Sequence, residues 1–299
     1  MNCRKEFLLL VGDNPFHGIS HLSQERARVR GNEATSPEKD AQLVMTCVEN
    51  GADGFMFSVS DLTLAILRTI REEGKADRLE LHAIVPYAFD YVRAAAQTGM
   101  PGLAKRLAKQ VVVSGDLASI AAGLKAAITA DPAALLRTYL SYEISRIRSA
   151  AKQANLASVL LHEVITDMGL ALNLRWLFES YVEFMSKRGI KPGFNTRNFP
   201  YLEKRFKEWN IDLGQTLILT SFNKVGFQMN PSRVECEEAL ARTTGQSVIA
   251  MSILAAGYIK PLEAIEYIRT LPNLKGVVVG VSKERHASET FKLLCERIK

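Results

Sequence analysis

The sequence has few cysteines and no long apolar run, and each shortage excludes a class of protein. Its four cysteines, at positions 3, 47, 236 and 295, are far apart and form no C-x-x-C pair. We therefore expect neither a thiolate zinc or iron–sulfur site nor a disulfide framework. No apolar stretch is long enough to span a membrane, and the run that follows the charged first residues is too short for a signal peptide. We expect a cytoplasmic protein with no membrane partner.

The sequence also has no block of charge of one sign. Its 38 Lys and Arg exceed its 32 Asp and Glu, which gives a formal net charge of +6. The basic residues are spread along the chain, so a nucleic-acid-binding surface is not predicted. The modest positive excess instead favours a small, anionic ligand as the partner. With 299 residues, 47% of them hydrophobic, the chain has ample material for a large core.

Short apolar segments recur along the chain with helical stretches between them. The predicted strands are 7–11, 55–59, 81–85, 159–161, 192–194, 216–220, 248–251 and 277–281. They lack polar alternation, as expected for parallel strands that are covered on both faces. Helix starts are indicated at Ser36–Pro37, Pro231–Ser232 and Lys260–Pro261. The pattern predicts an α/β fold, a (β/α)8 TIM barrel formed as one domain by residues 1–299. An open doubly wound sheet is the alternative, but no G-x-G-x-x-G follows the first strand.

One connection is too long for an ordinary crossover. The segment 88–156, between the third and fourth predicted strands, is helical in pattern and includes a helix start at Asp131–Pro132. We interpret it as the third barrel helix together with a helical insertion. The insertion would serve either as a contact in a homo-oligomer or as a lid over the barrel mouth.

Polar residues are concentrated at the carboxyl ends of the predicted strands, which meet at one mouth of a barrel. The predicted catalytic residues there are Asp13, His162, Glu163 and Lys224. The predicted substrate-binding residues are Asn14, His17, Asp61, Tyr87, Asn195, Arg197 and Asn223. The predicted cofactor-binding residues are Ser252, Gly280, Ser282, Lys283 and Arg285. So many hydrogen-bonding groups at one mouth favour an enzyme over a scaffold.

Two of these residues carry specific chemical hypotheses. His162 ends the fourth strand and is placed to act as a general acid or to orient a carbonyl oxygen. Lys224 follows the sixth strand, and apolar surroundings would lower its pKa and make it a nucleophile, whereas in a solvated loop it would have no such role. His17 and His21 have a spacing that would suit a metal on a helix, but Pro15 and Gly18 indicate a loop, so no metal is predicted. His82, in the middle of a strand, is expected to be a core residue.

The second half of the chain resembles the aldo-keto reductases. LLHEVITD is similar to the family's fourth strand, which ends in a histidine, and PGFNTRNFPYL is similar to its fifth. FNKVGFQMNP and GVVVGVSKERHASETF follow in the family's order, and the latter resembles the final strand and the turn that holds the phosphate of NADP. The resemblance implies a barrel, NADP as cofactor and His162 as the family's catalytic histidine.

The first half departs from that family. The family's second strand carries an aspartate followed by a tyrosine, and its third strand ends in a lysine. Here the corresponding segments are GADGFMFSVSD and HAIVPYAF, which have Met56 or Phe57 near the aspartate position, Asp61 at the tyrosine position and no lysine. Of the family's four catalytic residue types, only His162 is retained.

Three functions remain open on this basis. The first is a small-molecule enzyme on an aldo-keto-reductase-like barrel, an NAD(P)-linked oxidoreductase with altered catalytic residues. The second is a lyase or aldolase that forms a Schiff base through Lys224 and anchors a phosphorylated substrate at Ser282–Arg285. The third is a barrel that binds a ligand without catalysis. In the first two, the turn after the eighth strand is predicted to bind an anion through helix N–H groups, Lys283 and Arg285.

Overall fold

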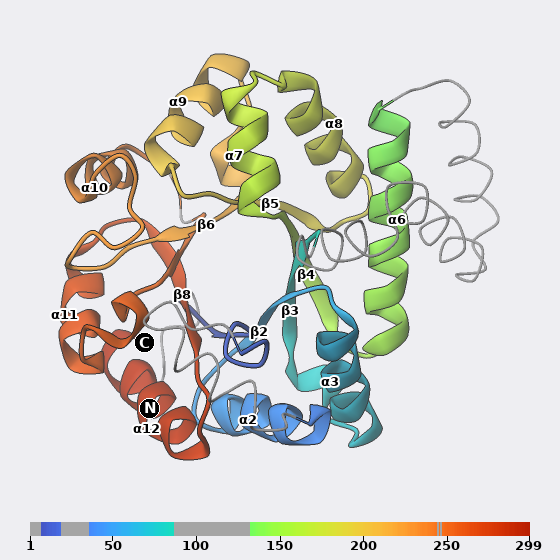
Figure 1. Ribbon diagram of the computed structural model, residues 1–299, viewed down its shortest axis with the longest axis vertical. Helices are drawn as coiled ribbons and strands as arrows, with labels where there is room; N and C mark the ends of the chain where they lie inside the picture. Colours follow the sequence, from blue (N-terminus) through green and yellow to red (C-terminus); the bar gives the residue numbers. More distant parts are fainter. Residues whose placement is uncertain (1–6, 19–35, 87–131, 244, 246) are drawn as a thin grey trace.

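Eight parallel strands close into a barrel in which each strand pairs with the next along the chain and β8 pairs with β1 (Figure 1). This computed structural model describes residues 7–18, 36–86, 132–243, 245 and 247–299. The strands are β1 (Leu8–Gly12), β2 (Gly54–Ser58), β3 (Glu80–Val85), β4 (Asn155–Leu161), β5 (Lys191–Asn195), β6 (Leu217–Ser221), β7 (Val248–Met251) and β8 (Leu274–Gly280). The predicted α/β TIM barrel is therefore confirmed, with all eight strands at their predicted places in the chain.

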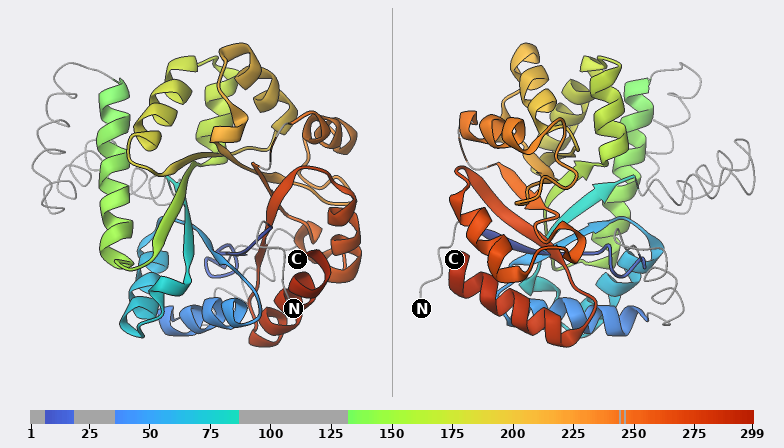
Figure 2. Two further views of the ribbon diagram at one scale, coloured as in Figure 1. Left: turned by 180° about the vertical axis from the view of Figure 1, so that it is seen from behind. Right: turned by 60° about the vertical axis from the view of Figure 1, so that its left-hand side comes forward.

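Helices surround the strands on the outside, as the views in Figure 2 show. The helices of the described residues are α2 (Pro37–Glu49), α3 (Asp61–Glu72), α6 (Pro132–Ala150), α7 (Glu163–Ala171), α8 (Arg175–Ser186), α9 (Phe199–Trp209), α10 (Arg233–Arg242), α11 (Pro261–Thr270) and α12 (Glu284–Ile298). Short 3-10 turns lie at η1 (Ala76–Arg78), η2 (Leu213–Gln215) and η3 (Ala255–Gly257). No helix in this part of the chain is long and apolar enough to cross a membrane.

The predicted helix starts coincide with real ones, and side-chain caps explain two of them. Ser36 accepts a hydrogen bond from the backbone N–H of Lys39, and Ser232 accepts one from Glu235. Both residues thus satisfy a backbone donor that has no partner within the helix. α11 begins at Pro261 and α6 at Pro132, where the missing N–H of proline costs nothing.

The long connection before β4 contains the third helix of the ring. α6 packs against α3 on one side and α8 on the other, so it occupies the place of the helix between β3 and β4. β4 begins at Asn155, four residues before the predicted strand, so the last two residues of the predicted 88–156 segment belong to the strand. The rest of the predicted insertion, up to residue 131, lies outside the described residues and stays a prediction.

Alternation along the strands divides the core in two. One side of each strand faces the barrel interior, where a small apolar cluster includes Leu10, Met56, Ile84, Leu160 and Leu219. The other side packs against the helices in a much larger cluster. Because Leu160 faces inward, the same alternation directs His162, two residues later, toward the mouth.

His82 and Ser158 form a polar pair in the lower interior of the barrel. The Nδ1 atom of His82 lies 2.8 Å from the hydroxyl of Ser158 on the neighbouring strand, and both residues are almost completely buried. The prediction that His82 is a core residue is confirmed.

Candidate active site at the barrel mouth

Asp13 ties together the ends of the first two strands. One of its carboxylate oxygens accepts the backbone N–H of Ser58 at 2.7 Å and lies 3.2 Å from Nε2 of His17. Asp13 is only 5% exposed, and a turn in which Phe16 N–H donates to the Asp13 carbonyl holds its loop. The predicted residues Asp13 and His17 therefore form one cluster at the mouth.

Asp40 adjoins this cluster and was missed by the sequence analysis. It lies in the first turn of α2, is 3% exposed, and has one carboxylate oxygen without a hydrogen-bond partner. Burial raises the pKa of Asp40 to about 6, and the nearby His17 opposes this shift. Asp40 lies on the apolar face of α2, next to Ala41 and one turn before Val44, and this position in the sequence could have indicated that its carboxyl group is buried.

His162 is the N-cap of α7. Its Nδ1 atom accepts the backbone N–H of Val164 at 3.2 Å. Burial lowers the pKa of His162, and so does the charge of Arg197, while the carboxylates of Glu163, Asp13 and Asp167 act in the opposite direction. The ring thus stands among acidic groups from the first and fourth strand ends, as predicted for a residue at the mouth.

Glu163 and Arg197 form a two-pronged ion pair between the loops that follow β4 and β5. Arg197 Nε lies 2.7 Å from one carboxylate oxygen of Glu163, and Nη2 donates to the other at 3.1 Å. The remaining terminal nitrogen donates to Gln228, whose side-chain oxygen also accepts from Ser252 at 3.4 Å. Arg197, predicted to bind substrate, therefore links the loops of four strands.

Asn195 and Asp167 complete the polar groups of this region. The amide nitrogen of Asn195 donates to Glu163 at 3.4 Å, while its amide oxygen is buried without a partner. Asp167 was missed by the sequence analysis, although it lies one helical turn after Glu163. It accepts the Thr196 hydroxyl at 2.5 Å and the Arg197 N–H at 3.0 Å, and burial raises its pKa.

The structure does not give Lys224 the apolar surroundings that a nucleophilic lysine needs. Its side chain is 54% exposed and its ammonium group lies 2.8 Å from the carboxylate of Glu263. The neighbouring Asn223 is buried, and both ends of its amide bind the backbone of Phe227 within the same loop. The structure therefore gives little support to Lys224 as a nucleophile, because its side chain is solvated. It gives little support to Asn223 as a substrate-binding residue, because its amide is used within its own loop.

The turn after β8 supports only part of the predicted anion site. The space beside Gly280 is filled by the ring of Pro15, since an added Cβ would lie 2.8 Å from its Cδ atom. Arg285 is 82% exposed and its Nε donates to Glu289 at 2.7 Å. Lys283, by contrast, is the exposed N-cap of α12 and forms no side-chain cap, so the first N–H groups of that helix keep their positive partial charge.

The other predicted site residues have various positions. Asn14 is exposed beside Asp13. Asp61 begins α3 and pairs at 2.8 Å with Arg146 of α6, so it joins two helices of the ring. Ser282 is half-buried next to Lys283, and Tyr87 lies outside the described residues. Among the described residues, no group of three or more His, Cys, Asp or Glu side chains is arranged to hold a metal ion.

Known structures share the fold. Two crystallised proteins from Pseudomonas aeruginosa, each described as a "putative aldo-keto reductase", are similar to it. The first match has a TM-score of 0.60 and 11% identity over 97% of this chain and 90% of that one. The second has a TM-score of 0.58 and 11% identity over 100% and 95%. The fold is an aldo-keto-reductase-like TIM barrel.

Identity at this level shows the fold alone, so it assigns no catalytic residue. Comparison of the sequence with protein families and with curated proteins gives no match. Any assignment of function must therefore rest on the residues at the mouth.

Proposed function

We propose that the protein is a small-molecule oxidoreductase that acts on a carbonyl group at the barrel mouth, with His162 polarising the carbonyl oxygen. One observation carries this proposal. Because the N–H of Val164 donates to Nδ1 of His162, the proton of the neutral ring lies on Nε2. The ring therefore offers a fixed N–H donor, and strand alternation directs it toward the mouth.

The protonation state supports the same role. Burial lowers the pKa of His162, so the ring is neutral at neutral pH. A neutral donor stabilises the negative charge that develops on a carbonyl oxygen without first losing a proton to it. His162 then orients and polarises the substrate, and the proton that the reduced oxygen needs comes from water.

The charges at the mouth suggest the kind of substrate. Asp13 and Asp167 stand near His162 beside the Glu163–Arg197 pair, whose charges cancel, so acidic groups outnumber basic ones around that ring. The buried, unpartnered amide oxygen of Asn195 is an acceptor for a hydroxyl group. We therefore favour a neutral hydroxy-aldehyde or hydroxy-ketone over the anionic substrate that the overall charge suggested.

The β8–α12 turn has the groups that a nucleotide phosphate requires. Lys283, the hydroxyl of Ser282 and the N–H groups at the start of α12 would hold it. NADP is the cofactor that we propose there, and its reduced form, NADPH, would when bound supply a hydride for the carbonyl carbon and leave as NADP+. Gly280 and Arg285 are not part of this proposal. The ring of Pro15 fills the space beside Gly280, and the guanidinium of Arg285 pairs with Glu289.

The test compares the wild type with His162→Asn. Asparagine is a favoured N-cap, so the start of α7 should be kept while the imidazole is lost. NADPH oxidation would be followed with glyceraldehyde and with propanal, and NADPH binding would be measured by calorimetry. We expect turnover to fall about 100-fold or more with cofactor affinity unchanged, and glyceraldehyde to be the better substrate of the wild type.

Two results would count against the proposal. A wild type that binds neither NADPH nor NADP would leave a barrel that binds another ligand. A His162→Asn variant with full turnover would show that the histidine only caps α7.

A further inference from the structure

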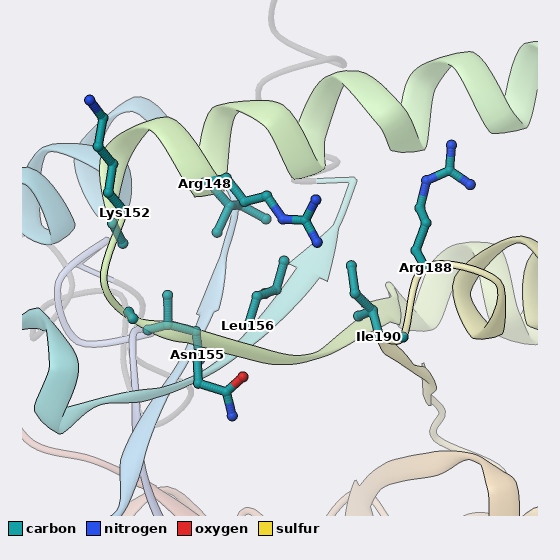
Figure 3. Close-up of a pocket in the computed structure, with 11 residues that line it drawn as sticks. Arg148, Lys152, Asn155, Leu156, Arg188 and Ile190 are labelled. Atoms are coloured by element: carbon teal, nitrogen blue, oxygen red, sulfur yellow. The ribbon is translucent and has the colours of Figure 1, made fainter.

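A cavity lies at the opposite end of the barrel from the mouth. It has a volume of about 380 Å³ and lies between the end of α6, the start of β4 and the loop that leads from α8 into β5. Figure 3 shows Arg148 extending from α6 over the space between Leu156 and Ile190, while Lys152 and Arg188 lie on either side with their charged ends pointing away from that space. None of the described residues that line this cavity is acidic.

The two cations on α6 and just beyond it are not needed to end that helix. The carbonyl of Ser149, in the last turn of α6, accepts a hydrogen bond from Arg71 of α3 at 2.8 Å. The N–H of Ala151 donates to the carbonyl of Ile147 in the ordinary helical pattern. Within the described part of the chain, Arg148 and Lys152 form no ion pair, so their charges are not compensated by a carboxylate.

The third cation is held in place. The guanidinium of Arg188 lies 3.6 Å from the centre of the Phe184 ring and donates to the hydroxyl of Ser141 at 3.3 Å. A stacked and hydrogen-bonded arginine presents its charge at a fixed position beside the cavity. Arg148 and Lys152 carry like charges one helical turn apart at the rim of the cavity, and an anion beside them would reduce their repulsion.

The floor of the cavity is apolar. Leu81, Ile147, Leu156 and Ile190 line it and belong to the packing of the barrel wall against its helices. A cationic rim over an apolar floor matches a ligand with one anionic group and a small apolar body.

We propose that this cavity binds a small organic anion, such as an aryl or alkyl carboxylate or sulfonate. The anionic group lies near Arg148 and Lys152, and the apolar body contacts Leu156 and Ile190. The site is separate from the mouth and does not depend on the oxidoreductase proposal.

Calorimetry with naphthalene-1-sulfonate on the purified full chain tests the site. The variant Arg148→Gln/Lys152→Gln removes two exposed charges, and Lys204→Gln/Lys207→Gln on α9 removes the same charge elsewhere as the matched control. We expect the first pair to weaken binding by about tenfold or more, and the control pair to leave it unchanged. Ala154→Trp, which fills the cavity, should abolish binding.

Measurements with other ligands distinguish a site for organic anions from simple apolar binding and from nonspecific ion binding. Naphthalene-1-methanol, which has no charge, should bind at least about tenfold more weakly than the sulfonate. Equal affinity for inorganic sulfate would mean an adventitious ion only and would overturn the proposal. So would unchanged affinity in the Arg148→Gln/Lys152→Gln variant, or no binding of the sulfonate to the wild type. His162→Asn should not change the affinity.

Discussion

Two histidines reach the barrel interior from neighbouring strands, yet their surroundings differ. His82 on β3 has its Nδ1 atom 2.8 Å from the hydroxyl of Ser158 and its Nε2 atom 3.4 Å from the carboxylate of Glu80, and it is 2% exposed. His162, just beyond β4, accepts a backbone N–H through Nδ1, and strand alternation directs its ring toward the mouth. One ring is almost completely buried, while the other is half-buried.

The difference follows from position along the strand. Residues in the lower interior meet side chains of neighbouring strands on every side, so a polar group there can be matched only by other groups of the protein. Residues at the carboxyl ends face loops, and the amide oxygen of Asn195 there is buried without a hydrogen-bond partner. An inward-facing histidine alone therefore indicates nothing about function until its level in the barrel is known.

The largest effect on stability is expected at His82. His82→Leu leaves the buried hydroxyl of Ser158 without its partner, which should lower the free energy of unfolding by about 1–3 kcal/mol. Adding Ser158→Ala removes that unmatched group, so the double variant should recover most of the loss. Urea denaturation of the wild type, both single variants and the double variant measures this coupling.

The same experiment separates the two histidines. The His82 variants should keep the cofactor affinity of the wild type, and His162→Asn should keep its stability. A double variant no more stable than His82→Leu would show that the pair with Ser158 is not what holds the base of the barrel together.

An effect of similar size, with a defined pH dependence, is expected at Asp40. Its pKa in the folded state is raised to about 6 by burial, so the folded protein holds this proton more tightly than the unfolded chain. The contribution to stability is therefore present below about pH 4 and is lost as the pH rises through about 6. Asp40→Asn should be more stable than the wild type at pH 8 by about 1–3 kcal/mol, and the gain should shrink at pH 5.

Urea denaturation at both pH values measures this difference. Asp77→Asn, an exposed acid on η1, controls for the change in net charge. A gain from Asp40→Asn that is equal at pH 5 and pH 8 would mean that the buried carboxylate is not the cause.

Much of the fold could be read from the sequence because its signals are local. Apolar segments bounded by turn residues located all eight strands, and Ser36 and Ser232 marked helix starts through caps that act within one turn. The segment after His162 was harder, because two helices, α7 and α8, lie between β4 and β5 where the repeating pattern leads one to expect one.

The site was less predictable because its contacts are not local. Asp13, His162 and Glu163 were found from their places at strand ends. Asp40 and Asp167 were not, because they lie on helices and matter only through residues brought near them by folding, namely His17 and Thr196. For Lys224 two alternatives were open, and the structure agrees with a solvated loop lysine, because its side chain is 54% exposed and pairs with Glu263.

The smallest effect is expected at the rim of the mouth, where two basic residues of similar sequence context differ in their contacts. Arg285 donates to Glu289, one turn later on α12, whereas Lys283 is the N-cap and forms no side-chain cap. Lys283→Ala should therefore weaken NADP binding by about threefold to tenfold, as expected for one exposed contact with a phosphate. Arg285→Ala should leave the affinity unchanged, and calorimetry with NADP and NAD on both variants checks this.

If the two variants weaken binding equally, Arg285 must exchange its ion pair with Glu289 for a contact with the ligand. If neither does, the start of α12 does not hold the phosphate, and the proposed cofactor must be placed elsewhere at the mouth.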